Sequence, residues 1–592
     1  INDPSSPSGA FDFSSILTGN IGSVEVLRGP NSVIWGSQAI GGVINVIPKK
    51  PQNTPYNEAE VSLDSNMTRR LSVDSTGPIN PNVSYRINAT GNMSNGWVDR
   101  DKTSNAAVSA AVRVQASENL AFTLSEDYAD RSPSRYFGTP LINGAIQDAL
   151  RFKNYNASDS AIRYQDSWTQ FKTEWDVADG IKVNNTLYYL TSERHWRDIE
   201  NYTWNPKTQL IDRSSYIEIF HDQKQSGNRM DATFSGHIFG LANQFVAGFD
   251  VNHIEFFHTN NSPYGGASSV NPYVFDPGSF FATTTATAPG FNSIVNQYAL
   301  FAEDNIQLGD RTIVTPGLRF DDHEEYGGNW SPSLNASHEL TDELTLKGGI
   351  ARPYKTPNLY QSNPGYLLYS RGNGCNASES NSGGCYLVGN PDLEPETSIN
   401  KEIGLAFDKG SWRTSATYFR NDYRNKIVGS NQYITRLSNG RRVLQWENTD
   451  EAVVEGVEGN LFVALSPQLE WNTNFTYMLE SEDKQTGEPL SVIPEYTLNS
   501  SLDWQMTQQL SLQLTGTYYG KQEAPSLNRR TGEAIDADAQ QDLDPYGLVG
   551  VSAGYEFNSN YSLRVGISNL LDKQIYREGN ANDAGANTYN EP

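Results

Sequence analysis

Residues 469–479 read Leu-Glu-Trp-Asn-Thr-Asn-Phe-Thr-Tyr-Met-Leu, and this stretch decides the fold class. Every second side chain from Leu469 onward is apolar, aromatic or threonine, whereas those between are Glu, Asn, Asn, Thr and Met. Successive side chains of a β-strand point to opposite faces, so the stretch predicts a strand with one apolar and one polar face. Residues 496–504 and 511–518 repeat the alternation. Strand-like segments separated by turn residues continue to the end of the chain with no sustained helical period.

The composition favours a membrane barrel over a soluble β-sandwich or β-propeller, which would also alternate on one face. The chain has 592 residues, a net charge of −25 and a mean hydropathy of −0.57. Barrel strands need only about 9–11 residues and alternate lipid-facing with lumen-facing side chains, so a negative mean hydropathy is compatible with them. The polar face is mostly uncharged, and the sequence offers no linker and no second apolar layer. The acidic charge argues against a nucleic-acid partner.

The strand number follows from the length. If one strand with its share of the connections takes roughly 24 residues, the sequence predicts an antiparallel transmembrane β-barrel of about 22 strands. Barrels of this size are plugged transporters rather than open channels.

The beginning of the chain differs from the rest. Residues 24–30 read Val-Glu-Val-Leu-Arg-Gly-Pro, and residues 40–47 read Ile-Gly-Gly-Val-Ile-Asn-Val-Ile. Glycine and proline interrupt two β-branched runs, which is typical of short strands joined by tight turns in a compact unit. We predict that residues 1–52 are the C-terminal part of a plug domain in the lumen, and that residues 56–592 form the barrel with long extracellular loops.

Several of these stretches resemble a known family. Residues 24–45 are similar to the end of the plug in TonB-dependent outer-membrane receptors, and residues 389–398 resemble the family's barrel signature. From about residue 300 onward the chain is most similar to receptors for ferric enterobactin and related catecholates. The segments that carry this likeness are residues 312–321, 360–366, 418–427, 453–459 and 588–592. Residues 56–290 resemble ferric-siderophore receptors in general.

This resemblance implies a location and a set of partners. We expect a monomer in the outer membrane of a Gram-negative bacterium, in contact with outer-membrane lipids and lipopolysaccharide. The expected ligand is an iron(III)–siderophore complex of the catecholate type, and the expected energy source is the TonB complex of the inner membrane. The family also has a signal peptide, a coupling box and the first half of the plug before the position of Ile1, and a closing strand after Pro592. We therefore expect residues 1–592 to be a fragment.

The two cysteines, Cys375 and Cys385, lie ten residues apart in a stretch rich in Gly, Ser and Asn. This spacing allows a disulfide that would restrain an extracellular loop by about 2–3 kcal/mol. A metal site is the alternative, but the sequence places no histidine or second cysteine pair nearby, so we predict the disulfide and no bound metal.

The family resemblance also implies a latch between plug and barrel. A plug arginine near the 24–30 motif pairs with glutamates of the barrel wall in this family. Arg28 is the matching arginine, Glu458 is the candidate wall partner, and Glu455 is the weaker candidate. The alternative is an arginine on the plug surface that has a local partner.

The ligand site should lie in loops that combine cations with flat hydrophobic surfaces, because a ferric tris-catecholate is a bulky aromatic trianion. Three loops have this composition, and the alternative for each is an interfacial aromatic girdle or a lipopolysaccharide contact. The candidate ligand-binding residues are Arg135, Tyr136, Trp196, Arg197, Tyr366, Tyr369 and Arg371.

The sequence contains no catalytic motif and no phosphate-binding loop, so we expect a transporter and not an enzyme. No covalently bound cofactor is expected, and the siderophore should supply the ligands of its own iron. Import of haem, cobalamin or an oligosaccharide through the same architecture is the alternative function. Haem receptors of the family usually place a histidine before the Asn-Pro-x-Leu signature, and none occurs between Arg352 and Asp392. A passive porin or an adhesin is disfavoured by the plug motif.

Overall fold

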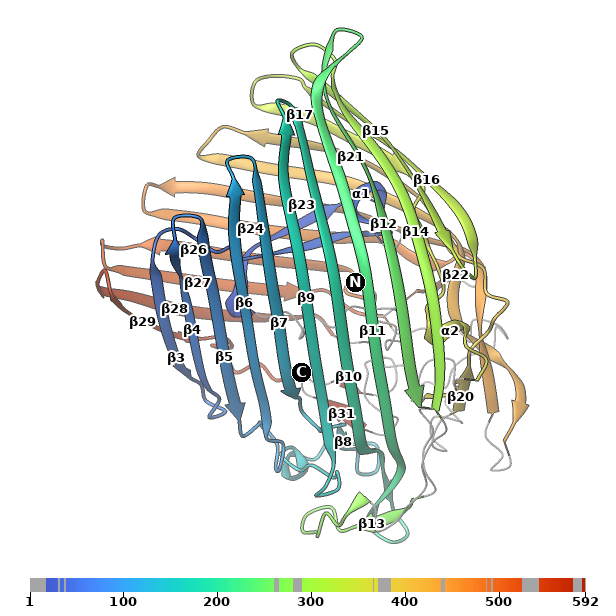
Figure 1. The fold of residues 1–592 in the computed structure, drawn as a ribbon. Helices are drawn as coiled ribbons and strands as arrows, with labels where there is room; N and C mark the ends of the chain where they lie inside the picture. Colours follow the sequence, from blue (N-terminus) through green and yellow to red (C-terminus); the bar gives the residue numbers. More distant parts are fainter. Residues whose placement is uncertain are drawn as a thin grey trace.

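The computed structural model is a large β-barrel with a small plug inside it (Figure 1). The structure describes residues 18–29, 32–36, 39–259, 266–280, 290–365, 367–370, 385–437, 442–485, 487–490, 493–523, 542, 544–575, 577–578 and 588–590. Among these residues, no helix combines the length and the apolar composition that crossing a membrane would require.

Twenty-one strands of the described residues form one continuous antiparallel ladder, close to the predicted number. Their bounds are β3 (Tyr56–Leu63), β4 (Arg69–Asn80), β5 (Val83–Ser94), β6 (Thr103–Ser117), β7 (Leu120–Ser132), β9 (Ala161–Ala178), β10 (Ile181–Asn205), β11 (Leu210–Ile238), β12 (Leu241–Thr259), β14 (Gly290–Gln307), β15 (Thr312–His323), β16 (Gly327–Glu339), β17 (Leu344–Ala351), β21 (Glu396–Asp408), β22 (Trp412–Arg436), β23 (Arg442–Ser466), β24 (Leu469–Asp483), β26 (Tyr496–Gln505), β27 (Leu510–Tyr519), β28 (Tyr546–Asn558) and β29 (Tyr561–Ile567).

Short strands and helices lie in the long connections at one end of the barrel. They are β8 (Thr139–Pro140), η3 (Asp148–Leu150), β13 (Ser268–Val270), β18 (Tyr354–Lys355), α2 (Leu359–Ser362), β19 (Leu367–Ser370), β20 (Cys385–Val388), β25 (Glu488–Pro489), β30 (Arg577–Glu578) and β31 (Thr588–Asn590). At the opposite end the strands are joined by tight turns, such as the two residues between β9 and β10. The wall therefore has one rim of short turns and one of long loops, as expected of an outer-membrane barrel.

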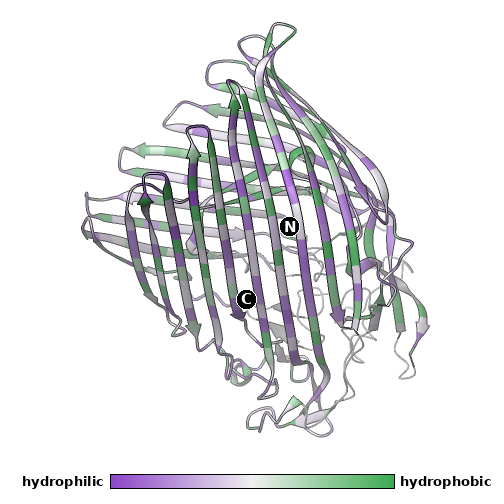
Figure 2. Ribbon diagram, viewed as in Figure 1, coloured by the Kyte–Doolittle hydropathy of each residue, from purple (hydrophilic) through white to green (hydrophobic). Residues whose placement is uncertain are grey.

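The faces of the wall are inverted relative to a soluble protein. On β4, Asp74 is only 3% exposed while the neighbouring Leu71 is 53% exposed. On β5, Arg86 and Asn88 are buried and Ile87 is exposed. The alternation of apolar and polar residues is visible along the wall strands in Figure 2. Apolar side chains that point outward while polar ones point inward require lipid outside, and this confirms the membrane barrel.

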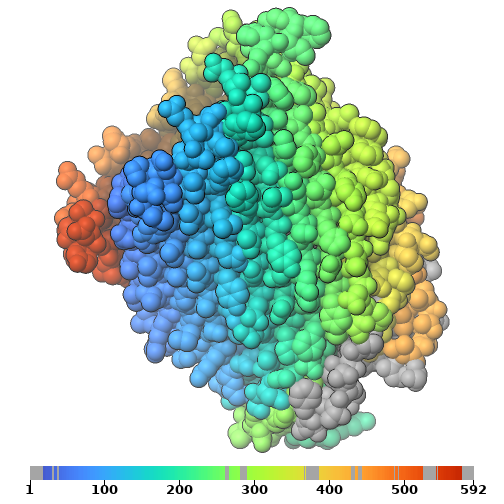
Figure 3. All heavy atoms as spheres, in the orientation of Figure 1, coloured from blue at the N-terminus to red at the C-terminus, as the bar shows by residue number. Residues whose placement is uncertain are grey.

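The plug lies in the lumen, behind the wall strands in Figure 1. Its described parts are η2 (Thr18–Asn20), β1 (Ile21–Arg28), α1 (Ser32–Trp35) and β2 (Gly42–Pro48), and β1 pairs with β2 as an antiparallel hairpin. Polar contacts fix it to the wall: Asn20 Nδ2 donates to Ser109 Oγ at 2.6 Å, and Lys49 pairs with Asp74 at 2.7 Å. From outside, Figure 3 shows packed side chains along the wall.

The strand order closes by placing β29 beside β3. This seam differs from the other neighbours, because no residue pair in register joins β29 to β3 among the pairings that the structure describes. All residues of both strands are also exposed. The expectation of a closing strand after residue 592 stays a prediction, as do the boundaries of the two domains.

Candidate ligand and plug-release sites

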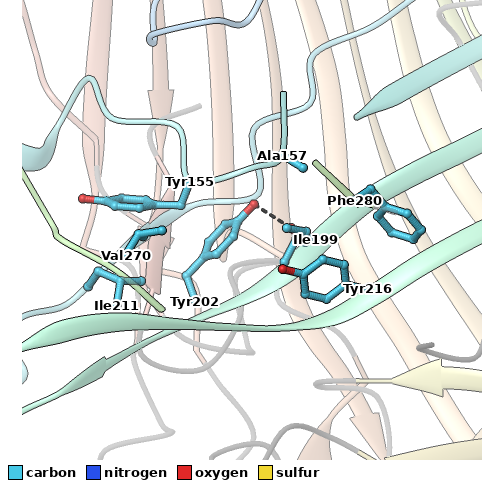
Figure 4. Close-up of a cluster of buried hydrophobic side chains, with 8 residues drawn as sticks. All are labelled: Tyr155, Ala157, Ile199, Tyr202, Ile211, Tyr216, Val270 and Phe280. Carbon is cyan, nitrogen blue, oxygen red and sulfur yellow. Dashed lines mark hydrogen bonds between the residues drawn. The ribbon is translucent and has the colours of Figure 1, made fainter. Parts of the chain in front are cut away.

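A buried aromatic core holds the loop end of β10 and β11 (Figure 4). Tyr155, Tyr202 and Phe280 are fully buried in it. The Tyr202 hydroxyl donates to the Ile199 carbonyl at 2.5 Å, and the Tyr155 hydroxyl donates to the Pro272 carbonyl at 2.7 Å. The described loops around this core are packed and hydrogen-bonded, so they present a preformed surface at the outer rim.

Arginines surround the segment 154–160 of this region and donate to backbone carbonyls. Arg135 Nη1 donates to Ser160 at 2.7 Å and Arg197 Nη2 to Asp159 at 2.8 Å. Arg100 donates to Asn156 at 3.1 Å, and Arg213 to the Tyr155 carbonyl at 3.1 Å. Two predicted ligand residues, Arg135 and Arg197, are thus brought to the same segment, where their guanidinium groups hold the loop.

These cations lie close to one another. Burial lowers the pKa of Arg100, Tyr202 and Asp99 act in the opposite direction, and the nearby charges of Arg213 and Arg135 contribute further lowering. Asp159 supplies a compensating negative charge: burial raises its pKa, but hydrogen bonds from the Phe280 amide and the Ser279 hydroxyl, both 2.6 Å long, outweigh burial and lower it. The segment therefore combines fixed positive charge with aromatic packing, which suits an anionic aromatic ligand.

The other predicted ligand residues are only partly described. Tyr136 is half-buried, donates or accepts a hydrogen bond with Thr139 at 2.8 Å, and packs edge-on to Trp97 at 5.1 Å. Trp196 donates to the Tyr164 hydroxyl at 2.9 Å. Tyr366 and Arg371 lie outside the described residues, as does the side chain of Tyr369. Cys375 and the side chain of Cys385 also lie outside them, so the disulfide stays a prediction.

A cavity of about 230 Å³ lies between the plug and the wall, and the sequence did not reveal it. Trp35 and Gly36 of the plug line it, together with Trp168, Tyr188 and Arg319 of the wall. Pockets for drug-sized ligands span about 300–1,000 Å³, so this cavity is too small for a whole iron chelate. A ligand that passes through the lumen must displace part of the plug.

The plug approaches β21–β23 where the latch is predicted. Gly29 adopts φ +77°, and a Cβ atom there would overlap the Glu402 carboxylate, so this turn requires glycine. Asn400, two residues before Glu402, donates to the Ile40 carbonyl of the plug. Both side chains therefore face the lumen. The side chain of Arg28 lies outside the described part of the chain.

The two predicted glutamates point to opposite faces of β23. In the register of β21, β22 and β23, Glu402 and Gly456 both pair with Phe419, so Glu458 shares the lumen face with Glu402. Glu455 is on the other face, where it pairs with Arg420 at 2.6 Å. The structure thus places Glu458 on the lumen face with Glu402 and gives Glu455 a partner on the opposite face. Glu402, which the sequence analysis missed, becomes visible only through the strand register.

Comparison with known proteins agrees with this architecture. A family model described as "TonB dependent receptor-like, beta-barrel" matches residues 94–570, and one described as "TonB-dependent Receptor Plug Domain" matches residues 1–43. The chain is 40% identical to the ferric enterobactin receptor PirA of Pseudomonas aeruginosa, over 96% of this chain and 77% of that protein. It is 35% identical to the ferrienterobactin receptor of Escherichia coli, over 96% of this chain and 79% of that protein.

A solved structure gives the same result. The crystal structure of a mutant of the ferric enterobactin receptor PfeA from Pseudomonas aeruginosa, in complex with enterobactin, superposes with a TM-score of 0.77 at 29% identity. The superposition covers 98% of this chain and 86% of that one. Because the barrel model spans most of the sequence and the relatives match nearly all of it, the chain belongs to the TonB-dependent receptor family.

Proposed function

We propose that this receptor binds an iron(III) complex of a catecholate-type siderophore in the outer membrane and imports it as an intact chelate. The TonB complex of the inner membrane supplies the energy, and the protein needs no covalently bound cofactor. The names of its relatives in Pseudomonas aeruginosa and Escherichia coli support the ligand class, since both are receptors for ferric enterobactin. They also support this ligand over haem, cobalamin or an oligosaccharide.

The observation that carries the transport proposal is the filled lumen. The β1–β2 hairpin and α1 occupy the barrel interior, and Asn20 and Lys49, which flank the hairpin, fix it to the wall by a hydrogen bond and an ion pair. A chelate bound at the outer rim cannot pass while these contacts persist, and the cavity beside Trp35 is too small to hold it. Binding and passage are therefore separate steps, and only passage requires work on the plug.

Initial binding takes place at the outer loops. The arginines around the segment 154–160 supply positive charge, and Tyr136 and Trp196 supply aromatic surface near the same rim. Tyr366, Tyr369 and Arg371 remain part of this proposed site. Cation–π and stacking contacts of about 0.5–2 kcal/mol each, summed over several residues, can reach nanomolar affinity.

The plug is released through the latch. We assign Arg28 as its plug member and Glu458 and Glu402 as its wall members, because Glu402 lies beside Gly29 and Glu458 shares its lumen face. Two carboxylates on one lumen face repel each other unless a cation lies between them, so a plug arginine there stabilises the seated plug.

The test compares binding and uptake of ferric enterobactin in cells with and without a functional TonB complex. We expect binding to be the same in both and accumulation of iron to be lost without TonB. Ferric haem and iron-free enterobactin serve as competitors. Undiminished uptake without TonB would refute active transport, and stronger competition by haem or by iron-free enterobactin would refute the ferric catecholate ligand.

A further inference from the structure

Two wall arginines that are not members of the predicted latch donate hydrogen bonds to the plug helix α1. Arg229 of β11 donates from Nη2 to the Ile34 carbonyl at 2.6 Å, and Arg319 of β15 donates from Nη1 to the Val33 carbonyl at 3.4 Å. The last four carbonyls of a helix have no partner within the helix, so in a one-turn helix such as α1 they can accept hydrogen bonds from the wall. Barrel and plug are thus joined here through plug backbone, whatever the plug side chains are.

The strand register places both arginines. Arg229 and Asp250 are directly paired across β11 and β12, and their side chains lie 3.7 Å apart. Arg319 pairs with Phe301 across β15 and β14. Both guanidinium groups lie over the Phe301 ring, at 4.9 Å for Arg229 and 5.7 Å for Arg319. A single buried ring therefore orients two cations toward the same helix.

Neighbouring glycines make room for this arrangement. A Cβ atom at Gly248 would overlap the Phe301 ring, and one at Gly317 would lie 3.2 Å from Val33 Cγ2. Val33 itself is buried, so the helix is seated closely against β15. The wall therefore contacts α1 in two ways: the side chain of Val33 packs at Gly317, and the two arginines donate hydrogen bonds.

Arg319 satisfies two partners at once. Nε donates to Asp321 Oδ1 at 2.8 Å, while Nη1 reaches the Val33 carbonyl, and the Arg319 side chain is only 4% exposed. A lysine in its place would keep the positive charge beside Asp321, but its single ammonium group cannot serve both partners with the same geometry. The lysine variant therefore separates the charge of the site from the contact with the plug.

We propose that Arg229, Arg319 and Phe301 form a clamp on the backbone of α1 that sets the threshold for plug movement, in addition to the Arg28 latch. This inference rests on the proposed function for its physiological meaning, since plug movement matters only if ligand passes through the lumen. The contact between the clamp and α1 does not depend on a ligand and can be measured in the purified receptor. Because its acceptors are neutral carbonyls, breaking it leaves no unpaired carboxylate on the plug, so it can open and close without a large electrostatic penalty.

The test is hydrogen–deuterium exchange of the purified receptor without ligand. Arg319→Lys, and the double variant Arg229→Gln with Arg319→Lys, should raise exchange at residues 33–36 about tenfold or more, because a hydrogen bond to a charged group is lost. Exchange in β4–β6 should not change. Arg163→Gln is the matched control: it removes an exposed arginine that pairs with Asp130 and has no role in the clamp.

The same variants are then assayed in cells. We expect the clamp variants to bind ferric enterobactin as tightly as the parent receptor does. Their rate of ferric enterobactin uptake should differ from that of the parent. Unchanged exchange at residues 33–36, or an increase spread equally over the wall strands, would overturn the clamp. Failure of the parent to take up ferric enterobactin would refute the proposed function while the exchange result still decides the clamp.

Discussion

The outer loops and the plug helix α1 are both held by arginines that donate to backbone carbonyls, yet with different consequences. At the loops, Arg100, Arg135, Arg197 and Arg213 and their acceptors all belong to the barrel domain. At the plug helix α1, Arg229 and Arg319 belong to the barrel and their acceptors belong to the plug. The first set makes a permanent surface and the second makes a contact that transport must break. The same chemistry therefore supports binding in one region and gating in the other.

The largest effect should follow from removing Arg213, the most buried of the loop arginines. It is 5% exposed and donates to the Pro277 carbonyl at 2.8 Å, to Ser268 Oγ at 2.8 Å and to the Tyr155 carbonyl. Arg213→Ala removes the donor to the Pro277 and Tyr155 carbonyls, which should cost about 2–4 kcal/mol of local stability. We expect faster hydrogen exchange at residues 154–160 and at least a tenfold loss of ferric enterobactin affinity, measured by fluorescence titration.

The control for this variant is Arg163→Ala, which removes an exposed ion pair with Asp130 and should leave loop exchange and affinity unchanged. If Arg213→Ala behaved like the control, the loop arginines would not be what holds the binding surface. The proposed difference between the loops and the plug would then not hold for the loops.

The glutamates of β21 and β23 should affect uptake more than binding. Glu458→Gln and Glu402→Gln should lower the uptake rate severalfold while leaving binding at the outer rim within twofold, since the lumen face lies away from the loops. Glu455→Gln is the matched control, because Glu455 is on the opposite face of the same strand and pairs with Arg420. Binding and uptake of labelled ferric enterobactin measure both quantities. Equal losses in all three variants would show that the effect comes from the strand and not from the latch.

The sequence was sufficient for the architecture because the architecture depends on local periodicity. Alternation at residues 469–479 corresponds to β24, and the runs around Gly29 and Gly41 correspond to the β1–β2 hairpin. Glu458 is a candidate from the sequence because it stands in a recognisable motif, and its role in the latch stays a prediction. Glu402 was not found, because only the pairing of both β21 and β23 with β22 brings it beside Glu458.

The ligand-binding loops show the limit of composition as a guide. Arg135 and Arg197 were selected because they accompany Tyr136 and Trp196, but composition could not show that their guanidinium groups hold the segment 154–160. Arg213 is not among the residues predicted from the sequence, because it does not stand in one of the three loops selected for their arginines and aromatic residues. The cavity at Trp35 was equally hidden, since its lining comes from strands far apart in the sequence.

The smallest expected effect is a pH dependence of the stability of the loop surface. The plug should not show this dependence. The Phe280 amide and the Ser279 hydroxyl hold the pKa of Asp159 below its usual value, although burial acts in the opposite direction. The folded-state pKa is therefore lower than the unfolded value of about 3.9, so the stabilisation is fully present above that value and is lost as the pH falls through the folded-state pKa.

We expect pepsin cleavage near Phe280 to accelerate only well below pH 4. Asp159→Asn should remove this dependence, whereas Asp276→Asn, which changes the charge of the same segment without contacting Asp159, should retain it. Cleavage that accelerated to the same extent in all three proteins would mean that acid loosens the loops through other carboxylates.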